Sequence, residues 1–186
     1  MDLKELCKPL EAHEIEFRVQ SINNGGYATI LAYKSARVDM QRLDDVVGPL
    51  NWKREHTRDN KNCVVSIWDE SKSQWISKED VGTESNTEAQ KGLASDSFKR
   101  ACFNWGIGRE LYDYPVISIK LAANEINEKN GKKYASWNFK LKEWVWYSQF
   151  YNGKISYLAA KAPSGNGWVK RFEWGEYNET LKTEDK

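Results

Sequence analysis

The chain has 186 residues, which is enough for one domain with a buried core but too few for a large multi-domain machine. Apolar residues make up 40% and charged residues 30%, and no apolar run approaches the roughly 18 residues that a membrane span requires. The net charge is only +1, so any nucleic-acid site has to be a local groove and not a generally basic surface.

The start of the chain and its cysteines bear on the cellular compartment. Residues 1–5 lack the succession of basic, apolar and small residues that marks a secretory signal, so we expect a cytoplasmic protein. Cys7, Cys63 and Cys102 are odd in number and far apart, and no Cys-x-x-Cys pair occurs. Free thiols are therefore expected, with neither a disulfide framework nor a zinc site.

The N-terminal part of the chain predicts a short helix and then a β-hairpin. Apolar residues in 1–12 recur at helical spacing, although Pro9 keeps this helix short. Residues 16–22 and 27–34 are β-rich, and the segment Asn23-Asn24-Gly25-Gly26 between them has the residue types of a tight turn. These two runs are predicted to pair.

The next segments predict a second helix and three strands. In residues 35–47 the apolar positions suit an amphipathic helix, which Gly48-Pro49 ends. Short β-rich runs separated by polar turns follow, and they predict an antiparallel meander of residues 51–57, 63–68 and 74–81.

The clearest helix of the sequence is predicted from Thr87 to Trp105, where apolar residues recur at helical spacing. Ser85 or Asn86 can cap its start, and Gly106 ends it. A helix with one apolar face needs a partner, so we expect this face to pack on the sheet.

The remainder of the chain is predicted to be polar at first and then rich in strands. Residues 116–121 predict a strand, and residues 124–133 predict a polar, lysine-rich loop. A hairpin is expected to join residues 155–160 to 168–174, and residues 180–186 should be disordered.

Together these elements predict an α+β fold, in which an antiparallel meander or hairpin sheet packs on a long amphipathic helix. We divide the chain between residues 122 and 123. Residues 1–122 hold the N-terminal helix, the sheet and the long helix, and residues 123–186 hold the polar loop, an aromatic-rich β extension and a disordered tail.

The constellations that catalysis needs are missing from the sequence. No Gly-rich loop ends in Gly-Lys-Ser/Thr, so no ATP site is expected. Neither His13 nor His56 lies at metal-ligand spacing from a second His or Cys. Asp44-Asp45 and Glu79-Asp80 could hold Mg²⁺ for a nuclease, but adjacent side chains diverge, which favours capping or ion pairing.

The predicted long helix carries a basic stripe. Lys91, Ser95 and Lys99 stack on one side because residues four apart are neighbours on a helix, and Arg100 lies beside them. Lys and Arg supply the charge-assisted contacts that a phosphate backbone needs. The alternative interpretation is a solvated face with an Asp96–Arg100 ion pair.

Several short segments in a fixed order carry a resemblance to a known family. They are Arg37-Val38, Leu43-Asp44-Asp45-Val46-Val47-Gly48, Asn51-Trp52, Glu79-Asp80-Val81-Gly82, Ala89-Gln90-Lys91, Asp96-Ser97-Phe98-Lys99-Arg100-Ala101 and Trp105-Gly106. This ordered set covers roughly residues 15–110 and resembles the annealing domain of the Rad52/Rad22 family of recombination proteins, including its bacteriophage (Sak-like) members.

The resemblance implies a ring or filament of many subunits, with single-stranded DNA in a basic outer groove and no nucleotide or metal cofactor. It implies DNA contacts from Arg18, Lys91, Lys99 and Arg100. The family often has a further arginine where this chain has Phe103, so we expect either fewer phosphate contacts or a substitute such as Arg37 or Lys34.

The resulting prediction is a protein that binds single-stranded DNA and anneals complementary strands in recombination or repair, without chemical catalysis. Expected partners are further copies of the chain, single-stranded DNA, and a single-stranded DNA-binding protein or an exonuclease. A phage-encoded chain would act in the host cytoplasm. Three alternatives stay open: a general single-stranded DNA-binding protein, a small metal-dependent nuclease and a purely structural oligomer.

Overall fold

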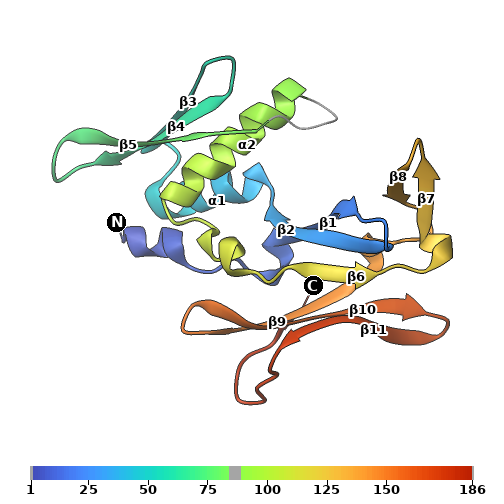
Figure 1. The fold of residues 1–186 in the computed structure, drawn as a ribbon. Helices are drawn as coiled ribbons and strands as arrows, with labels where there is room; N and C mark the ends of the chain where they lie inside the picture. The colour runs from blue at the N-terminus through green and yellow to red at the C-terminus, as the bar shows by residue number, and fades with distance from the viewer. Residues whose placement is uncertain (1, 84–88, 186) are drawn as a thin grey trace. The chain divides into compact units, whose positions relative to one another are not determined.

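The computed structural model describes residues 2–83 and 89–185, except for the side chains of residues 89–91 and 184–185 (Figure 1). Its contacts form two compact units that interleave in the sequence. Unit 1 comprises Met1–Leu10 and Lys34–Arg109, and unit 2 comprises Glu11–Tyr33 and Glu110–Lys186. This division differs from the predicted one between residues 122 and 123, because strand β6 of the later segment pairs with strand β2 of the earlier one.

Unit 1 contains two α-helices and one antiparallel sheet in its described residues. The elements are the 3-10 helix η1 (Leu3–Cys7), α1 (Ala36–Val47), β3 (Trp52–Thr57), β4 (Asn62–Asp69), β5 (Gln74–Val81) and α2 (Ala89–Asn104). The strand order β3-β4-β5 is the predicted meander. Helix α2 packs on β4 and β5. The predicted helix start at Thr87 and its caps lie outside the described residues.

The core of unit 1 follows from strand alternation and helical spacing. Alternate residues of β4, Cys63, Val65 and Ile67, are buried on the face that meets α2. Phe98 supplies a ring from α2 and Trp105 supplies one from the turn after it, and the Trp105 indole N–H donates to the Val65 carbonyl at 3.1 Å. Helix α2 and the sheet therefore bury apolar side chains in one shared core, as the apolar pattern predicts.

Two glycines of unit 1, Gly82 and Gly106, stand at positions where the structure leaves no room for a side chain. A Cβ atom at Gly82, just beyond β5, would lie 2.6 Å from the Ser97 backbone nitrogen of α2, so only glycine allows this approach. Gly106 ends α2 with a φ of 99°, a conformation that side chains disfavour, and a Cβ there would collide with Cys7.

Unit 2 is built mainly from strands. Its elements are η2 (Ala12–Glu14), β1 (Ile15–Ile22), β2 (Tyr27–Lys34, whose last residue belongs to unit 1), η3 (Arg109–Asp113, whose first residue belongs to unit 1), β6 (Ile117–Lys120), η4 (Ala123–Glu125), β7 (Ile126–Lys129), β8 (Lys132–Ala135), η5 (Leu141–Glu143), β9 (Val145–Tyr151), β10 (Lys154–Ser164), β11 (Gly167–Gly175) and β12 (Glu184–Asp185). The sheet orders are β1-β2-β6, β11-β10-β9-β12 and β7-β8.

Aromatic rings fill much of the core of unit 2. Phe17 stacks on Trp146 with ring centres 3.8 Å apart. Phe139 and Trp144 pack edge to face, with ring centres 5.3 Å apart. Trp144 and Trp146 are both buried in the same cluster. Stacked and edge-to-face rings of this kind add to the stability that burial alone provides.

Two segments of unit 2 differ from the sequence prediction. Residues 124–133 were expected to form a loop, but they contain β7 and the start of β8, which pair through the turn Asn130-Gly131. Both turn residues have positive φ, at 53° and 71°, as a two-residue hairpin turn requires. Strand β9 was not predicted at all, and it pairs with β10.

The tail also differs from its prediction. The Gln149 side-chain amide donates to the Asn178 carbonyl and to Thr183 Oγ1, both at 2.9 Å. β12 then pairs with β9. The segment from Asn178 to Asp185 thus lies against the sheet, although disorder was predicted for residues 180–186, because the fully buried Gln149 side chain finds its hydrogen-bond partners in Asn178, Leu181 and Thr183.

The α+β class with antiparallel sheets is confirmed. Assembly into a ring stays a prediction. Among the helices that the structure describes, none combines the length and the apolar character that crossing a membrane requires.

Candidate nucleic-acid interface

The two adjacent cations of α2, Lys99 and Arg100, face different neighbours within unit 1. Arg100 Nε lies 3.3 Å from Asp80 Oδ1 on β5, and 41% of the Arg100 side chain is exposed. Lys99 is half-buried, and its charge helps to lower the pKa of Asp39 on α1 against the larger effect of burial. The two side chains therefore leave α2 toward β5 and α1, as the 100° step between successive helical residues dictates.

The Asp96–Arg100 ion pair of the alternative interpretation does not form, because each side chain has another partner. Asp96 Oδ2 accepts a hydrogen bond from the backbone N–H of Thr83 at 2.8 Å, so this carboxylate holds the end of the segment that follows β5. Arg100 pairs with Asp80, and Asn104 Nδ2 donates to the other Asp80 oxygen at 3.3 Å. Arg100 stays partly exposed, so a phosphate could reach it by displacing one carboxylate.

Lys34 is not available as a DNA contact, which corrects its prediction as a substitute for the missing arginine. Its side chain is 1% exposed and forms an ion pair with Asp39. The Lys34 ammonium also lies 4.4 Å from the centre of the Phe103 ring. Phe103 thus packs against Lys34 and helps to enclose it.

Burial of the Lys34–Asp39 pair has an electrostatic consequence. Desolvation raises the pKa of Asp39 to about 6, against the attraction of Lys34. Asp39 Oδ2 is buried without a hydrogen-bond partner within the described part of the chain. The pair is therefore buried inside unit 1 and is not part of an open groove.

The other two predicted residues of unit 1 lie near its helix starts. Arg37 is exposed in the first turn of α1, where a phosphate can reach it. Lys91 is in α2, but its side chain lies outside the described residues.

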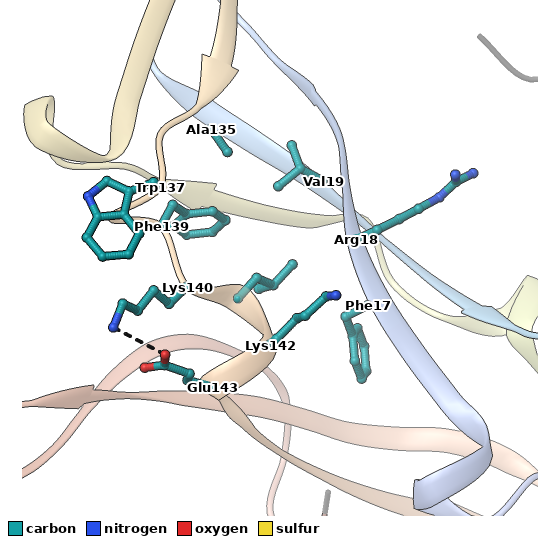
Figure 2. Close-up of a pocket in the computed structure, with 10 residues that line it drawn as sticks. Phe17, Arg18, Val19, Ala135, Trp137, Phe139, Lys140, Lys142 and Glu143 are labelled. Atoms are coloured by element: carbon teal, nitrogen blue, oxygen red, sulfur yellow. Dashed lines mark ion pairs between the residues drawn. The ribbon is translucent and has the colours of Figure 1, made fainter. Parts of the chain in front are cut away.

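Arg18 belongs to unit 2, whereas the α2 residues belong to unit 1. It is exposed on β1, and its guanidinium is 5.3 Å from the centre of the Tyr33 ring. Burial, together with a 2.6 Å hydrogen bond to Glu16, raises the pKa of Tyr33 to about 12. Figure 2 shows that Arg18 extends away from its neighbours Phe17 and Val19, as alternation along a strand requires.

Sequence reasoning missed a second group of surface cations that lie against aromatic rings. In unit 2, Lys140 Nζ lies 5.6 Å from the centre of the Trp137 ring, which is 81% exposed. In unit 1, Lys53 Nζ lies 5.1 Å from the Trp75 ring centre. For Lys140 and Trp137 the signal in the sequence was the Trp and Lys content of residues 137–144, which helical or strand periodicity does not report.

The acidic residues that a nuclease would use have other partners. Asp44 Oδ1 accepts a hydrogen bond from the Trp52 indole at 2.7 Å, and Asp80 is paired with Arg100. In the described part of the chain, no three His, Cys, Asp or Glu side chains gather so that they could hold a metal ion.

Part of the chain matches the sequence model of a known protein family. Residues 61–131, which run from β4 through α2 to the turn after β7, match the sequence model of the Rad52/22 family double-strand break repair protein. The matched segment includes Lys99, Arg100 and the ion partner Asp80.

Two relatives are more specific. The chain is 33% identical over 115 residues to the single-stranded DNA-binding protein DdrA of Deinococcus radiodurans, which is 60% of this chain and 55% of the relative. It is 32% identical over 115 residues to the protein of that name from Deinococcus deserti, covering 60% and 57%. The chain thus spans about half the length of these curated relatives, and no solved structure matches it.

Proposed function

We propose that this protein is a member of the Rad52/22 family that binds single-stranded DNA and anneals complementary strands during DNA repair or recombination, without covalent catalysis. The observation that carries the proposal is that the family match falls on the segment in which α2 presents Lys99 and Arg100. The names of the DdrA relatives agree with single-stranded DNA as the ligand.

Annealing is a physical problem that needs charge and no bond chemistry. Two DNA strands repel each other, and each folds on itself. Lys99 and Arg100, together with Arg37, Lys91 and Arg18 in our proposal, neutralise phosphates and release counterions. The bases remain outside and sample a complementary strand. No nucleotide or metal is part of this mechanism.

We further propose that many copies of the chain assemble into a ring or filament, so that repeated weak contacts extend one strand along the assembly. This assembly reconciles a net charge of +1 with DNA binding, because each subunit has to contribute only a few phosphate contacts. We place the protein in the cytoplasm, or in the host cytoplasm for a bacteriophage (Sak-like) member. A single-stranded DNA-binding protein or an exonuclease is the proposed protein partner.

The experiment that tests the proposal is an annealing assay on the purified full chain. Complementary oligonucleotides should pair faster with the protein than without it, and EDTA should have no effect. Replacing Lys99 and Arg100 together by alanine should slow annealing and reduce the log-log salt slope of single-strand binding by about 0.7 for each lost phosphate contact.

The matched control is Lys129→Ala in β7, an exposed cation at a distance in sequence from α2. It removes one positive charge and should leave the salt slope unchanged. A Lys99→Ala/Arg100→Ala variant that is folded by circular dichroism and binds with wild-type affinity and slope would remove α2 from the site.

A general single-stranded DNA-binding protein is the second candidate, and the printed name of the DdrA relatives favours it. Such a protein coats a strand and blocks pairing. The same assay separates the two functions, because coating would slow annealing at saturating protein whereas an annealing protein would accelerate it.

A further inference from the structure

Unit 2 holds a pocket of about 510 Å³ between β1 and residues 135–143 (Figure 2). Its floor is apolar and includes Phe17, Val19, Phe139 and Leu141. All of its lining residues lie outside residues 61–131, which are the ones that match the family. The pocket is therefore a feature that the family match does not explain.

Packing and hydrogen bonds hold the floor and one wall of this pocket. Phe17 is stacked on Trp146 with an angle of 5° between the rings, and Phe139 is buried against Trp144. A turn holds the wall, because the Phe139 N–H donates to the Ser136 carbonyl at 3.0 Å and Ser136 Oγ donates to the Asn124 carbonyl at 2.6 Å. A ligand would thus meet a site that is already formed.

Trp137 projects from this turn and is 81% exposed. In Figure 2 its ring stands on the side of the pocket opposite Phe17 and Val19. A single exposed tryptophan needs no explanation by itself. Here, however, a wide ring stands at the edge of an apolar hollow, which is the arrangement that a flat aromatic ligand requires.

The rim of the pocket carries positive charge. Lys140 Nζ lies 5.6 Å from the centre of the Trp137 ring and 3.2 Å from Glu143 Oε1. Lys142 is exposed, and Figure 2 shows its side chain extending toward β1. The two ammonium groups outnumber the one carboxylate, so the rim favours a ligand that joins a flat apolar ring to anionic groups.

We propose that this pocket takes one unpaired base of single-stranded DNA, which stacks on Trp137 while Lys140 and Lys142 contact the flanking phosphates. The inference rests on the proposed function, since it names the same ligand, but it adds a base-stacking site that the phosphate contacts of α2 do not provide. A base held here is removed from pairing, so the site anchors the strand and does not sample complements.

The test compares Trp137→Ala with the wild-type chain on two oligonucleotides of equal length, one of thymidines and one with an abasic backbone. The alanine variant should bind the thymidine strand about tenfold more weakly, because stacking on one ring is lost. Its affinity for the abasic strand and its salt slope should not change. Trp137→Phe should restore most of the loss, and bound thymidine should quench tryptophan fluorescence less in Trp137→Phe than in wild type.

Trp168→Ala is the matched control, because Trp168 is another exposed tryptophan of unit 2, on β11, at 56% exposure. If Trp137→Ala binds the thymidine strand as tightly as wild type does, the stacking site is overturned and the proposed function stays intact. Equal loss on both strands would assign Trp137 to folding or assembly and would also overturn it. A wild-type chain that binds neither strand overturns this inference and the proposed function together.

Discussion

The ion pair Lys34–Asp39 in unit 1 and the ion pair Arg171–Glu125 in unit 2 differ in how much water reaches them. The first pair has side-chain exposures of 1% and 0%, and the second has 20% and 12%. The geometry differs as well. Arg171 gives Glu125 two parallel hydrogen bonds, at 2.9 and 2.8 Å, whereas Lys34 reaches one oxygen of Asp39.

The two carboxyl groups respond in opposite directions. Burial raises the pKa of Asp39 to about 6, and the charge of Lys34 does not fully compensate. Burial would also raise the pKa of Glu125, but hydrogen bonds from Arg171 and from the Ala122 N–H hold it below its ordinary value. Full burial thus disfavours the charged form of Asp39, one of whose oxygens has no hydrogen-bond partner among the described residues. Glu125 keeps its charge more easily, because it is less buried and both of its oxygens accept hydrogen bonds.

The largest expected effect is on the fully buried pair. Asp39→Ala should lower the free energy of unfolding by about 3–5 kcal/mol, because it leaves the Lys34 ammonium buried without a counter-charge. Urea unfolding followed by circular dichroism measures this. A loss below about 1 kcal/mol would show that Lys34 escapes to water and that the burial of this pair is not a strong constraint.

A double replacement tests whether Lys34 has only a structural role or also contacts DNA, as the sequence predicted. Lys34→Met/Asp39→Leu removes both charges and keeps the volume, so its stability should approach that of wild type. Its salt slope for single-stranded DNA should equal the wild-type slope. A slope reduced by about 0.7 would return Lys34 to the phosphate contacts.

The second prediction is a pH dependence, for which the double variant is the reference. A carboxyl whose pKa is raised in the folded state adds stability that is complete below its unfolded pKa and is lost as pH rises through about 6. The stability of wild type relative to the double variant should therefore fall by about 2 kcal/mol between pH 4 and pH 7. A difference that rises over this range would mean that Asp39 titrates below its ordinary pKa.

The third prediction concerns the partly exposed pair. Glu125→Gln should cost about 1–2 kcal/mol, because Arg171 loses a charged acceptor but keeps the Gln oxygen. The lowered pKa of Glu125 means stability that is present above its unfolded pKa and lost as pH falls, opposite in sign to Asp39. The control is Glu143→Gln, whose surface pair with Lys140 should contribute less than about 0.5 kcal/mol to urea unfolding.

The sequence predicted those parts of the fold whose signals are local. The turn at Asn23-Asn24-Gly25-Gly26, the meander and the long helix each have a clear periodicity or turn chemistry, and each is present. The Asn130-Gly131 turn was just as clear, but its strands have four residues each and few apolar side chains, so their polar character led to the prediction of a loop. The interleaving of the two units depends on the pairing of β2 with β6, which no local pattern encodes.

The candidate site was less predictable for a related reason. Lysine is almost never fully buried, so nothing in the pattern around Lys34 indicated that Asp39 and Phe103 enclose it. The divergence of Lys99 and Arg100 could have been predicted from helix geometry, but their partners on α1 and β5 could not. Trp137 was visible as a residue type, whereas the hollow beside it exists only when β1 and residues 135–143 come together.

The Arg100–Asp80 pair, with side-chain exposures of 41% and 25%, is more exposed than the Lys34–Asp39 and Arg171–Glu125 pairs, so a smaller effect on stability is expected there. Asp80→Asn keeps an oxygen for the hydrogen bonds from Arg100 and Asn104, so the free energy of unfolding should change by less than about 1 kcal/mol. Single-strand binding should respond more clearly, because a phosphate that contacts Arg100 has to displace this carboxylate. Affinity measured by fluorescence anisotropy at low salt should rise about threefold, with a smaller gain at high salt, where the carboxylate is screened.

Asp69→Asn makes the same change in net charge at a carboxylate paired with Lys72, and it should not alter binding. In an Arg100→Ala background the Asp80→Asn gain should disappear, since the two residues are coupled. A gain of the same size in that background would show that Asp80 repels the strand directly and that Arg100 is not its competitor for phosphate.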